Sequence, residues 1–260
     1  MPADAANPER LAELTEGAAA LYNTANPPYD RWLTDWPPLA SSLLTTAERT
    51  GAVLVSAASL YGYGAVTGPM TETTALAGTN PKLKLRAQMW RDALAAHKGG
   101  RIRATEVRSS DILQGTGVFS ATMAKPLLAG KRAVVPMPLD HPHTFTSVND
   151  VAAALVTVAT DERAWGKPWH TPANDPLTVR ELATRFTHVT NSPAPRLTAI
   201  PYAVLWAAGV FVPLVRELRI THYQWDRPFI ADSTAITETF GLKAQSIDDA
   251  LSEAAQLVQS

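Results

Sequence analysis

Three glycines follow the most apolar segment in the first half of the chain, and this pattern raises the question of phosphate binding. Residues 52–58 are continuous, apolar and β-branched, which predicts a buried parallel strand. Gly62, Gly64 and Gly68 come after it. A dinucleotide site needs a glycine turn that opens a helix, because the helix N-terminus holds the pyrophosphate. Pro69 and a polar run follow instead, so we interpret these glycines as a loop.

Other residue types that perform chemistry are sparse. His141 and His143 flank a proline, but no third and fourth ligand follow at a spacing typical of zinc sites, so we expect no metal. The absence of cysteine excludes disulfides, iron–sulfur clusters and a thiol nucleophile. The sequence contains no G-x-S-x-G serine motif. Asp248 and Asp249 stand where a C-terminal helix is predicted to begin, and the helix dipole accounts for their charge.

Composition and charge narrow the class of protein. The chain has 260 residues, of which 46% are hydrophobic and 18% charged, so it can form a sizeable core. Lys and Arg number 23 against 24 Asp and Glu, which gives no reason to expect a nucleic-acid partner. The N-terminus carries no signal-peptide pattern, so we expect a cytoplasmic protein. The apolar segment Ala199–Val215 contains two prolines and is short for a membrane span, and we favour a packed helix over membrane association.

The elements that must position any site alternate between strand and helix over the first 110 residues. This alternation predicts βαβ units and a parallel sheet, followed by a smaller mixed lobe. Strands are expected at residues 19–24, 52–58, 102–107, 133–136, 143–147 and 165–171. Helices are expected at 8–18, 39–50, 82–97, 148–160, 179–189, 201–214 and 246–257, with a loop at 26–38.

Several segments together resemble one family. VLVSAASLYGYG (Val53–Gly64), HTFTSVNDVAAAL (His143–Leu155) and RPFIADSTAITETFGLKAQSIDDAL (Arg227–Leu251) are similar to the NAD-dependent epimerase/dehydratase family of extended short-chain dehydrogenases. Residues 3–28 and 169–182 look like further family segments in the same order, so the resemblance covers nearly the whole chain. Residues 3–28 look like the family's stretch from its third strand onward. The resemblance therefore implies that this chain lacks the family's opening strand and glycine-rich turn.

The resemblance implies a fold and a function. The expected fold is α/β, with an N-terminally truncated Rossmann-type parallel sheet and a small C-terminal α/β substrate lobe. Residues 1–117 would form a partial NAD(P)-binding domain and residues 118–260 the substrate-binding lobe. The cofactor would be NAD or NADP, and the substrate a small molecule or a sugar nucleotide. Homodimers are common in the family. The alternative is a non-catalytic binding or regulatory protein, or a truncated pseudoenzyme, on the same fold.

The family's catalytic pair, Tyr-x-x-x-Lys, is degenerate in this chain. The best register places Asn80 at the tyrosine position and Lys84 at the lysine position, and the alternative register uses Gly78 and Lys82. An amide cannot move the proton that a tyrosine moves. The resemblance leaves Lys84 to hold the nicotinamide ribose, and Ser59 or a substrate group to replace the proton donor.

Other positions are carried over from the family one by one. The loop after the family's fourth strand, which passes the cofactor, corresponds to Asn23, Thr24, Ala25 and Asn26. Further cofactor contacts would come from Ser56, Ser109 and Ser110, together with Lys84. The resemblance implies substrate contacts for Tyr61, Asp111, Thr144 and Arg227.

Overall fold

The structure is a computed structural model that describes residues 3–115 and 117–259. It divides into two compact units, each built from separate stretches of the chain. Unit 1 contains the chain up to Gly64 with Thr74–Arg108 and Ala152–His170, and unit 2 contains Ala65–Thr73, Ser109–Val151 and the chain from Thr171 onward. The proposed division into a partial NAD(P)-binding domain at 1–117 and a substrate-binding lobe at 118–260 stays a prediction.

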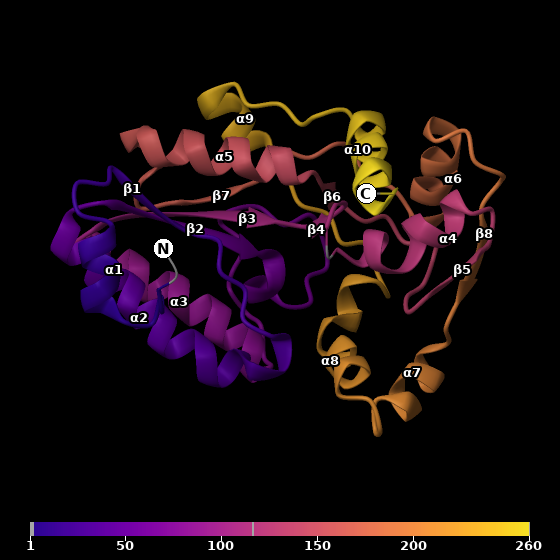
Figure 1. Ribbon diagram of the computed structural model, residues 1–260, viewed down its shortest axis with the longest axis horizontal. Helices are drawn as coiled ribbons and strands as arrows, with labels where there is room; N and C mark the ends of the chain where they lie inside the picture. The colour runs from indigo at the N-terminus through magenta and orange to yellow at the C-terminus, as the bar shows by residue number, and fades with distance from the viewer. Residues whose placement is uncertain (1–2, 116, 260) are drawn as a thin grey trace. The chain divides into compact units, whose positions relative to one another are not determined.

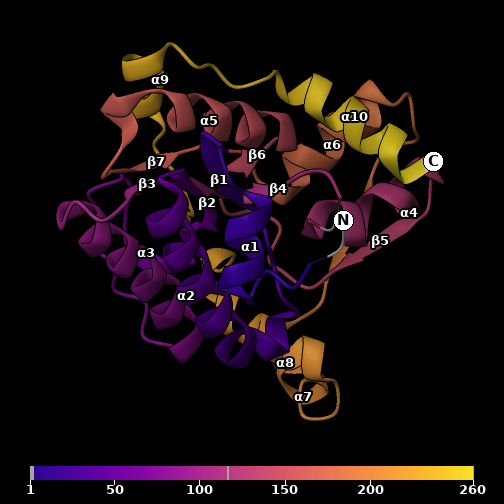
Figure 2. The ribbon, with the colours of Figure 1, turned by 60° about the vertical axis from the view of Figure 1, so that its left-hand side comes forward.

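Unit 1 is built on a four-stranded sheet. The order is β1 (Ala20–Asn23), β2 (Val53–Ser59), β3 (Arg103–Ser109) and β7 (Pro168–His170). β1 pairs in parallel with β2, and β3 with β7. Helices α2 (Trp32–Thr50) and α3 (Pro81–Lys98) lie on one face of the sheet, with α1 (Pro8–Leu14) against α2, and α5 (Val148–Thr160) lies on the other face (Figures 1 and 2). The predicted α/β class with a parallel sheet is confirmed.

Helix α2 begins earlier than the sequence predicts. The expected loop at 26–38 is wrong from Trp32 onward, because Pro37 and Pro38 lie inside the helix. Two prolines remove two backbone donors from a helix. The buried side chains of Trp32, Trp36 and Leu39 recur at helical spacing and pack into the core with Leu54 and Trp90 from β2 and α3, and this packing outweighs the lost hydrogen bonds.

Unit 2 contains two short parallel ladders and a separate core. β4 (Asp111–Ile112) pairs with β6 (Phe145–Thr146), and β5 (Arg132–Val135) pairs with β8 (Arg196–Ala199). Phe119 and Phe186 meet edge to face in the core, with ring centroids 5.0 Å apart. The remaining helices are α4 (Lys125–Leu128), α6 (Val179–Val189), α7 (Tyr202–Ala208), α8 (Pro213–Thr221), α9 (Thr234–Phe240) and α10 (Ile247–Gln259). Short 3-10 turns occupy Tyr29–Arg31, Leu60–Tyr63, Glu162–Ala164 and His222–Gln224, and a π-helical turn occupies Ser120–Ala124.

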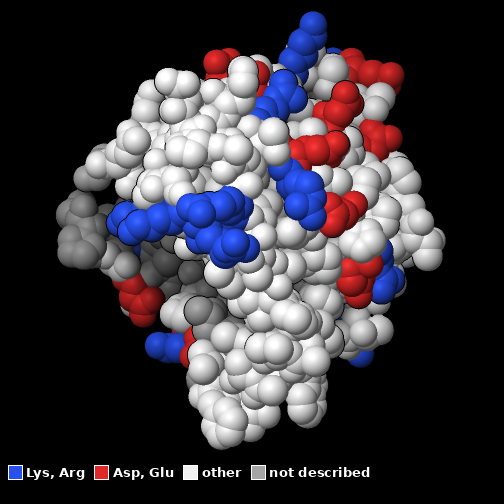
Figure 3. Space-filling model, turned by 90° about the vertical axis from the view of Figure 1, so that its right-hand side faces the viewer, with Lys and Arg blue, Asp and Glu red and all other residues white. Residues whose placement is uncertain are grey.

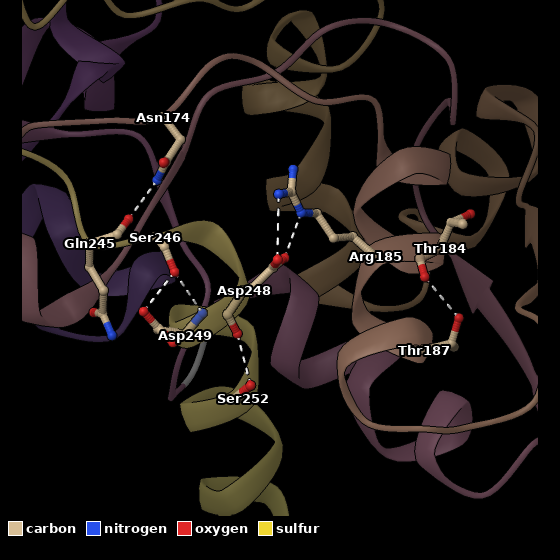
Figure 4. Close-up of polar contacts among 9 residues, drawn as sticks. All are labelled: Asn174, Thr184, Arg185, Thr187, Gln245, Ser246, Asp248, Asp249 and Ser252. Atoms are coloured by element: carbon tan, nitrogen blue, oxygen red, sulfur yellow. Dashed lines mark hydrogen bonds and ion pairs between the residues drawn. The ribbon is translucent and has the colours of Figure 1, made fainter.

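The acidic pair near the C-terminus has a structural role (Figure 4). Ser246 accepts a hydrogen bond from the backbone N–H of Asp249 at 3.2 Å and donates to its carboxylate at 2.7 Å, which caps α10. The Asp248 carboxylate pairs with Arg185 of α6 at 2.5 Å. Both aspartates therefore fix the start of α10, as the helix-dipole interpretation predicted.

The apolar segment Ala199–Val215 does not form the packed helix that we expected. It contains two short helices, α7 and the start of α8, with a link at residues 209–212. Within α7 only Leu205 is buried. Gly209 and Pro213 explain the break, since glycine weakens a helix and proline starts a new one. None of the described helices is long and apolar enough to cross a membrane.

Candidate active site

The predicted cofactor residues of the first loop lie at the carboxyl edge of the sheet in unit 1. Asn23 ends β1 and stands beside Ser56 of β2 in the strand register. Asn23 is buried, and its side-chain oxygen accepts a hydrogen bond from the Ala25 N–H at 3.3 Å. Thr24, Ala25 and Asn26 follow on the surface. Ligands of open α/β sheets bind at this edge, and a cofactor contact by these groups stays a prediction.

A buried network of polar side chains crosses β3 and β7 in unit 1. Arg108 donates to the Glu106 carboxylate at 2.7 Å and to the Tyr63 hydroxyl at 2.7 Å. The Tyr63 hydroxyl lies 2.7 Å from Nε2 of His170, the neighbour of Arg108 in the ladder. Burial lowers the pKa of Arg108. Glu106 and Tyr63 raise that pKa by more than burial lowers it, so the net shift is upward. Arg108 therefore stays charged inside the unit.

A second arginine faces the same carboxylate. The Arg86 guanidinium of α3 lies 4.5 Å from the Trp36 ring centroid and donates to the Ala57 carbonyl at 3.3 Å. Burial lowers the pKa of Arg86 and the charge of Glu106 opposes that shift. Two guanidinium groups thus share Glu106 within unit 1. Burying a charge that has no opposite charge beside it costs free energy, and here two positive groups face one negative group.

Two cavities meet at these charged groups. A small one of about 10 Å³, close to the volume of one water, is lined by Ser59, Arg86, Glu106 and Arg108. The Ser59 hydroxyl is buried and has no hydrogen-bond partner in the described part of the chain. A larger pocket of about 380 Å³ lies between α2, α3 and the sheet, and Asn23, Ser56, Arg86 and Glu106 contribute to its lining. The structure therefore brings Ser56 and Ser59 near one charged network, whose members Arg86, Glu106, Tyr63 and His170 the sequence analysis missed.

Neither register of the degenerate pair reproduces a tyrosine–lysine dyad. Asn80 caps α3, since its side chain accepts from the Lys82 N–H at 2.9 Å. Lys84 is exposed and lines an outer pocket of about 620 Å³. Lys82 is buried and donates to the Tyr29 carbonyl at 2.5 Å. Its Nζ lies 4.6 Å from the centroid of the Tyr29 ring. Gly78 leaves no room for a side chain, because a Cβ there would lie 2.6 Å from the Leu83 Cβ.

Among the predicted substrate residues, Tyr61 packs against aromatic rings. Its ring centroid lies 5.9 Å from that of Trp32 and 6.3 Å from that of Tyr29. The ring is half-buried within unit 1. Gly62 lies in the same 3-10 turn, Leu60–Tyr63, and Gly64 follows that turn with a φ of 72°. A Cβ on Gly64 would lie 2.8 Å from the Gly78 Cα, so close backbone approach explains this glycine, and its interpretation as a loop residue is confirmed.

Asp111 lies in unit 2 and forms a hydrogen-bonded pair with His143. Their Oδ2 and Nε2 atoms are 2.9 Å apart, and Nδ1 of His143 lies 3.1 Å from the Gln224 carbonyl oxygen. The imidazole stacks on the Trp225 ring, with centroids 4.0 Å apart. A carbonyl cannot donate, so Nδ1 carries a proton, and a second proton lies between Nε2 and the carboxylate. Asp111 is about one-fifth exposed, so part of its carboxylate is accessible to a ligand.

The other predicted residues of unit 2 have structural partners. Ser109 and Thr171 share a hydrogen bond of 2.7 Å between their hydroxyls. Thr144 is buried and accepts from the Ala231 N–H at 3.0 Å. Arg227 pairs with the adjacent Asp226 at 2.7 Å, and that hydrogen bond raises its pKa. Ser110 differs, because its hydroxyl is buried without a partner in the residues described.

No cluster suited to a metal ion exists in residues 3–115 and 117–259, where no three His, Asp or Glu side chains converge. The two histidines of the DHPH sequence have different contacts. His143 belongs to the pair with Asp111, and His141 lies beside Asp140, a surface partner of Arg180.

No protein-family model matches the chain, and no curated protein sequence matches it either. Solved structures do match. A double mutant of a dTDP-glucose 4,6-dehydratase from Streptomyces venezuelae, with NAD bound, is 18% identical with a TM-score of 0.72, covering 99% of this chain and 78% of that one. A dTDP-glucose 4,6-dehydratase from Bacillus anthracis in complex with NAD is 18% identical with a TM-score of 0.74, covering 100% and 79%.

A third match is a UDP-glucose 4-epimerase from Thermotoga maritima with UDP-glucose. It is 13% identical with a TM-score of 0.77, and the match covers 99% of this chain and 83% of that one. At these identities the similarity establishes the fold. The chain has a Rossmann-type α/β fold with a parallel sheet, like NAD-dependent dehydratases and epimerases.

Proposed function

We propose that the chain is an NAD(P)-dependent oxidoreductase of the epimerase/dehydratase type, acting on a small or sugar-nucleotide-like substrate. One observation carries the proposal: Asn23, Ser56 and the loop 24–26 lie together at the carboxyl edge of a parallel sheet. The similarity to folds solved with NAD and with sugar nucleotides supports it.

The residues present suit part of a dinucleotide. The amide of Asn23, the hydroxyl of Ser56 and the exposed loop 24–26 offer donors and acceptors for a ribose and a nicotinamide amide. Residues 3–115 and 117–259 contain no strand, glycine turn and helix N-terminus arranged around a pyrophosphate. The proposal therefore assigns these residues to the ribose and nicotinamide portion. The cofactor, when bound, accepts or returns a hydride.

Proton transfer in this proposal falls to groups other than residue 80. The Asn80 amide is engaged as a helix cap and has no acid–base chemistry near neutral pH. Asp111, paired with His143 in unit 2, stays a proposed substrate contact. Ser59 supplies a hydroxyl in unit 1 and can orient a ligand or a water there.

Binding of the cofactor is the direct test. Isothermal titration of the full chain with NAD⁺ and NADP⁺ is expected to give saturable binding of one of them, and Ser56→Ala is expected to weaken it severalfold. Ser252→Ala is the control, because that hydroxyl donates to the Asp248 carbonyl in unit 2. Absence of binding by either nucleotide contradicts the proposal. Equal affinities of the two serine variants contradict the placement of the site.

The second candidate function is a non-catalytic binding protein on the same fold, and the role of Asn80 as a cap favours it. Turnover of UDP-glucose and dTDP-glucose in the presence of the bound nucleotide distinguishes the two. Asn80→Tyr is expected to raise turnover if the rest of the site is assembled. Asn80→Asp is the control, since it keeps the cap and adds no phenol. Binding without turnover in all three forms identifies a binding protein.

A further inference from the structure

The helices α7 and α8 carry an unusual surface. Within residues 202–212, which we name the apolar hairpin, six large apolar side chains are exposed: Tyr202, Val204, Trp206, Val210, Phe211 and Val212. Phe211 is the most exposed of these, at 86%. Single exposed apolar residues are ordinary on any protein, but a contiguous group marks a surface that binds something apolar.

The backbone of the apolar hairpin is already satisfied by arginines. Arg216 of α8 donates from Nε to the Gly209 carbonyl at 3.1 Å and from Nη2 to the Val210 carbonyl at 3.4 Å. Arg219 donates to the Trp206 carbonyl, and its guanidinium lies 4.9 Å from the Trp206 ring centroid. The Trp206 carbonyl belongs to the last turn of α7, whose carbonyls lack helical partners, and the Gly209 and Val210 carbonyls lie beyond the helix. The hairpin can therefore enter an apolar medium without stranding these acceptors.

A group of cations lies on the strand that leads into the hairpin. Arg132 of β5 and Arg196 of β8 are exposed and stand directly opposite each other in the ladder, and Lys131 is exposed just before β5. The two arginines donate to Thr198 and to the Gly130 carbonyl, and none of the ion pairs among the described residues involves any of the three cations. Like charges opposite each other destabilise a ladder unless an anion is present.

Figure 3 shows these features on one side of the molecule. Lys and Arg side chains gather into a patch, and below it, where Figure 1 places α7 and α8, the surface protrudes and carries no charge over its tip. At about 3.3 Å per residue, the six residues from Arg196 to Tyr202 span at most about 20 Å. That distance exceeds the Debye length of about 8–10 Å, so the cations act on anionic headgroups that lie beside the patch itself.

We propose that the apolar hairpin docks unit 2 onto the surface of a bilayer that contains anionic lipids. Phe211, Trp206 and Val210 would enter the boundary between headgroups and acyl chains, while Arg216 and the β5–β8 cations face the headgroups. A protruding tip with exposed Trp and Tyr fits a fluid interface, where these rings concentrate. A small-molecule site, by contrast, is concave. The proposal is independent of the proposed enzymatic function, and it reverses our sequence-based expectation for this segment.

Flotation of the full chain with vesicles tests the proposal. The chain is expected to float with phosphatidylcholine vesicles containing about one-quarter phosphatidylserine, and much less with phosphatidylcholine alone. The double variant Trp206→Ser with Phe211→Ser is expected to lose binding by roughly tenfold or more, because each ring loses its apolar contact with lipid. Val134→Ser is the control, since Val134 is 51% exposed on β5 outside the hairpin. Arg132→Glu with Arg196→Glu is expected to abolish the preference for phosphatidylserine.

Other outcomes overturn the proposal. Wild-type chain that stays at the bottom of the gradient with phosphatidylserine vesicles contradicts it. Equal flotation of the double variant and the wild type contradicts it as well. Light scattering without vesicles tests whether a second copy of the chain covers the hairpin instead. If the wild type does not float but forms a dimer that the double variant does not form, the partner of the hairpin is a second chain and not a lipid. Circular dichroism of each variant shows that the fold is retained, so loss of binding is not loss of structure.

Discussion

Replacing Glu106 with glutamine removes a carboxylate that faces two buried guanidinium groups. The Glu106 and Arg108 side chains are only 8% and 3% exposed, and their atoms are 2.7 Å apart. Arg86 approaches the same carboxylate from α3. Glutamine keeps the shape and an oxygen that accepts from Arg108, but it leaves both arginines without a counter-charge. Breaking a buried pair on one side costs about 3–5 kcal/mol, and we expect a loss near 3 kcal/mol because the hydrogen bond persists.

Urea unfolding followed by tryptophan fluorescence measures this loss. Unit 1 contains Trp32, Trp36, Trp90, Trp165 and Trp169 of the seven tryptophans in the chain, so the signal reports mainly on the unit that changes. With a urea slope of about 3 kcal/mol/M, the midpoint of Glu106→Gln is expected to fall by about 1 M.

A matched control separates burial from charge loss alone. Glu48→Gln makes the same substitution in the same unit, where Glu48 pairs with Arg101 and both side chains are about half exposed. An exposed pair contributes less than about 1 kcal/mol, so this midpoint is expected to move little. If the two variants unfold at the same urea concentration, the charge balance that we assign to Glu106 is wrong, and another group compensates Arg86 and Arg108.

Two further predictions concern pH. Burial and the charge of Glu253 raise the pKa of Asp150, although the hydrogen bond from the Gln245 N–H opposes this shift. Folding therefore favours the protonated Asp150 carboxyl. The contribution of Asp150 to the free energy of unfolding falls as pH rises from about 4. Asp150→Asn is therefore expected to gain melting temperature relative to wild type between pH 4 and 7, and a constant difference across that range contradicts this. Burial, with the charge of Asp111, raises the pKa of Tyr223 to about 12, so wild type is expected to lose about 2–3 kcal/mol between pH 10 and pH 12. Tyr223→Phe lacks this loss, and parallel urea midpoints of the two proteins across that range refute the assignment.

The elements that the sequence predicted well share a strong local pattern. The segment around β2 is a continuous β-branched run, and α5 is predicted with the bounds that the structure has, Val148–Thr160. The helix predicted at 82–97 corresponds to α3, which the structure caps with Asn80. α2 is the exception, because the preference of Pro37 and Pro38 against a helix interior is local, whereas the packing of Trp32 and Trp36 that overrides it is tertiary.

The candidate site was only partly predictable. Asn23 could be placed because it ends a parallel strand, and Ser56 is its neighbour in the register, three residues before β2 ends. The Arg108–Tyr63–His170 chain could not, since its members are separated by 45 and 107 residues and no spacing rule links them. One signal was available: Glu106 and Arg108 are charged residues two apart on one strand, which places both on the same face.

The buried charges of unit 1 and the exposed apolar side chains of unit 2 both lie in the less favourable environment. Unit 1 buries charges that would be more stable in water, and unit 2 exposes apolar side chains that would be more stable in a core. Each arrangement costs stability, and natural sequences keep such costs mainly where function requires them. The exposed apolar tip around Phe211 is the feature that the bilayer proposal explains. If Phe211→Ser raises stability but abolishes flotation with vesicles, the cost of that tip is functional.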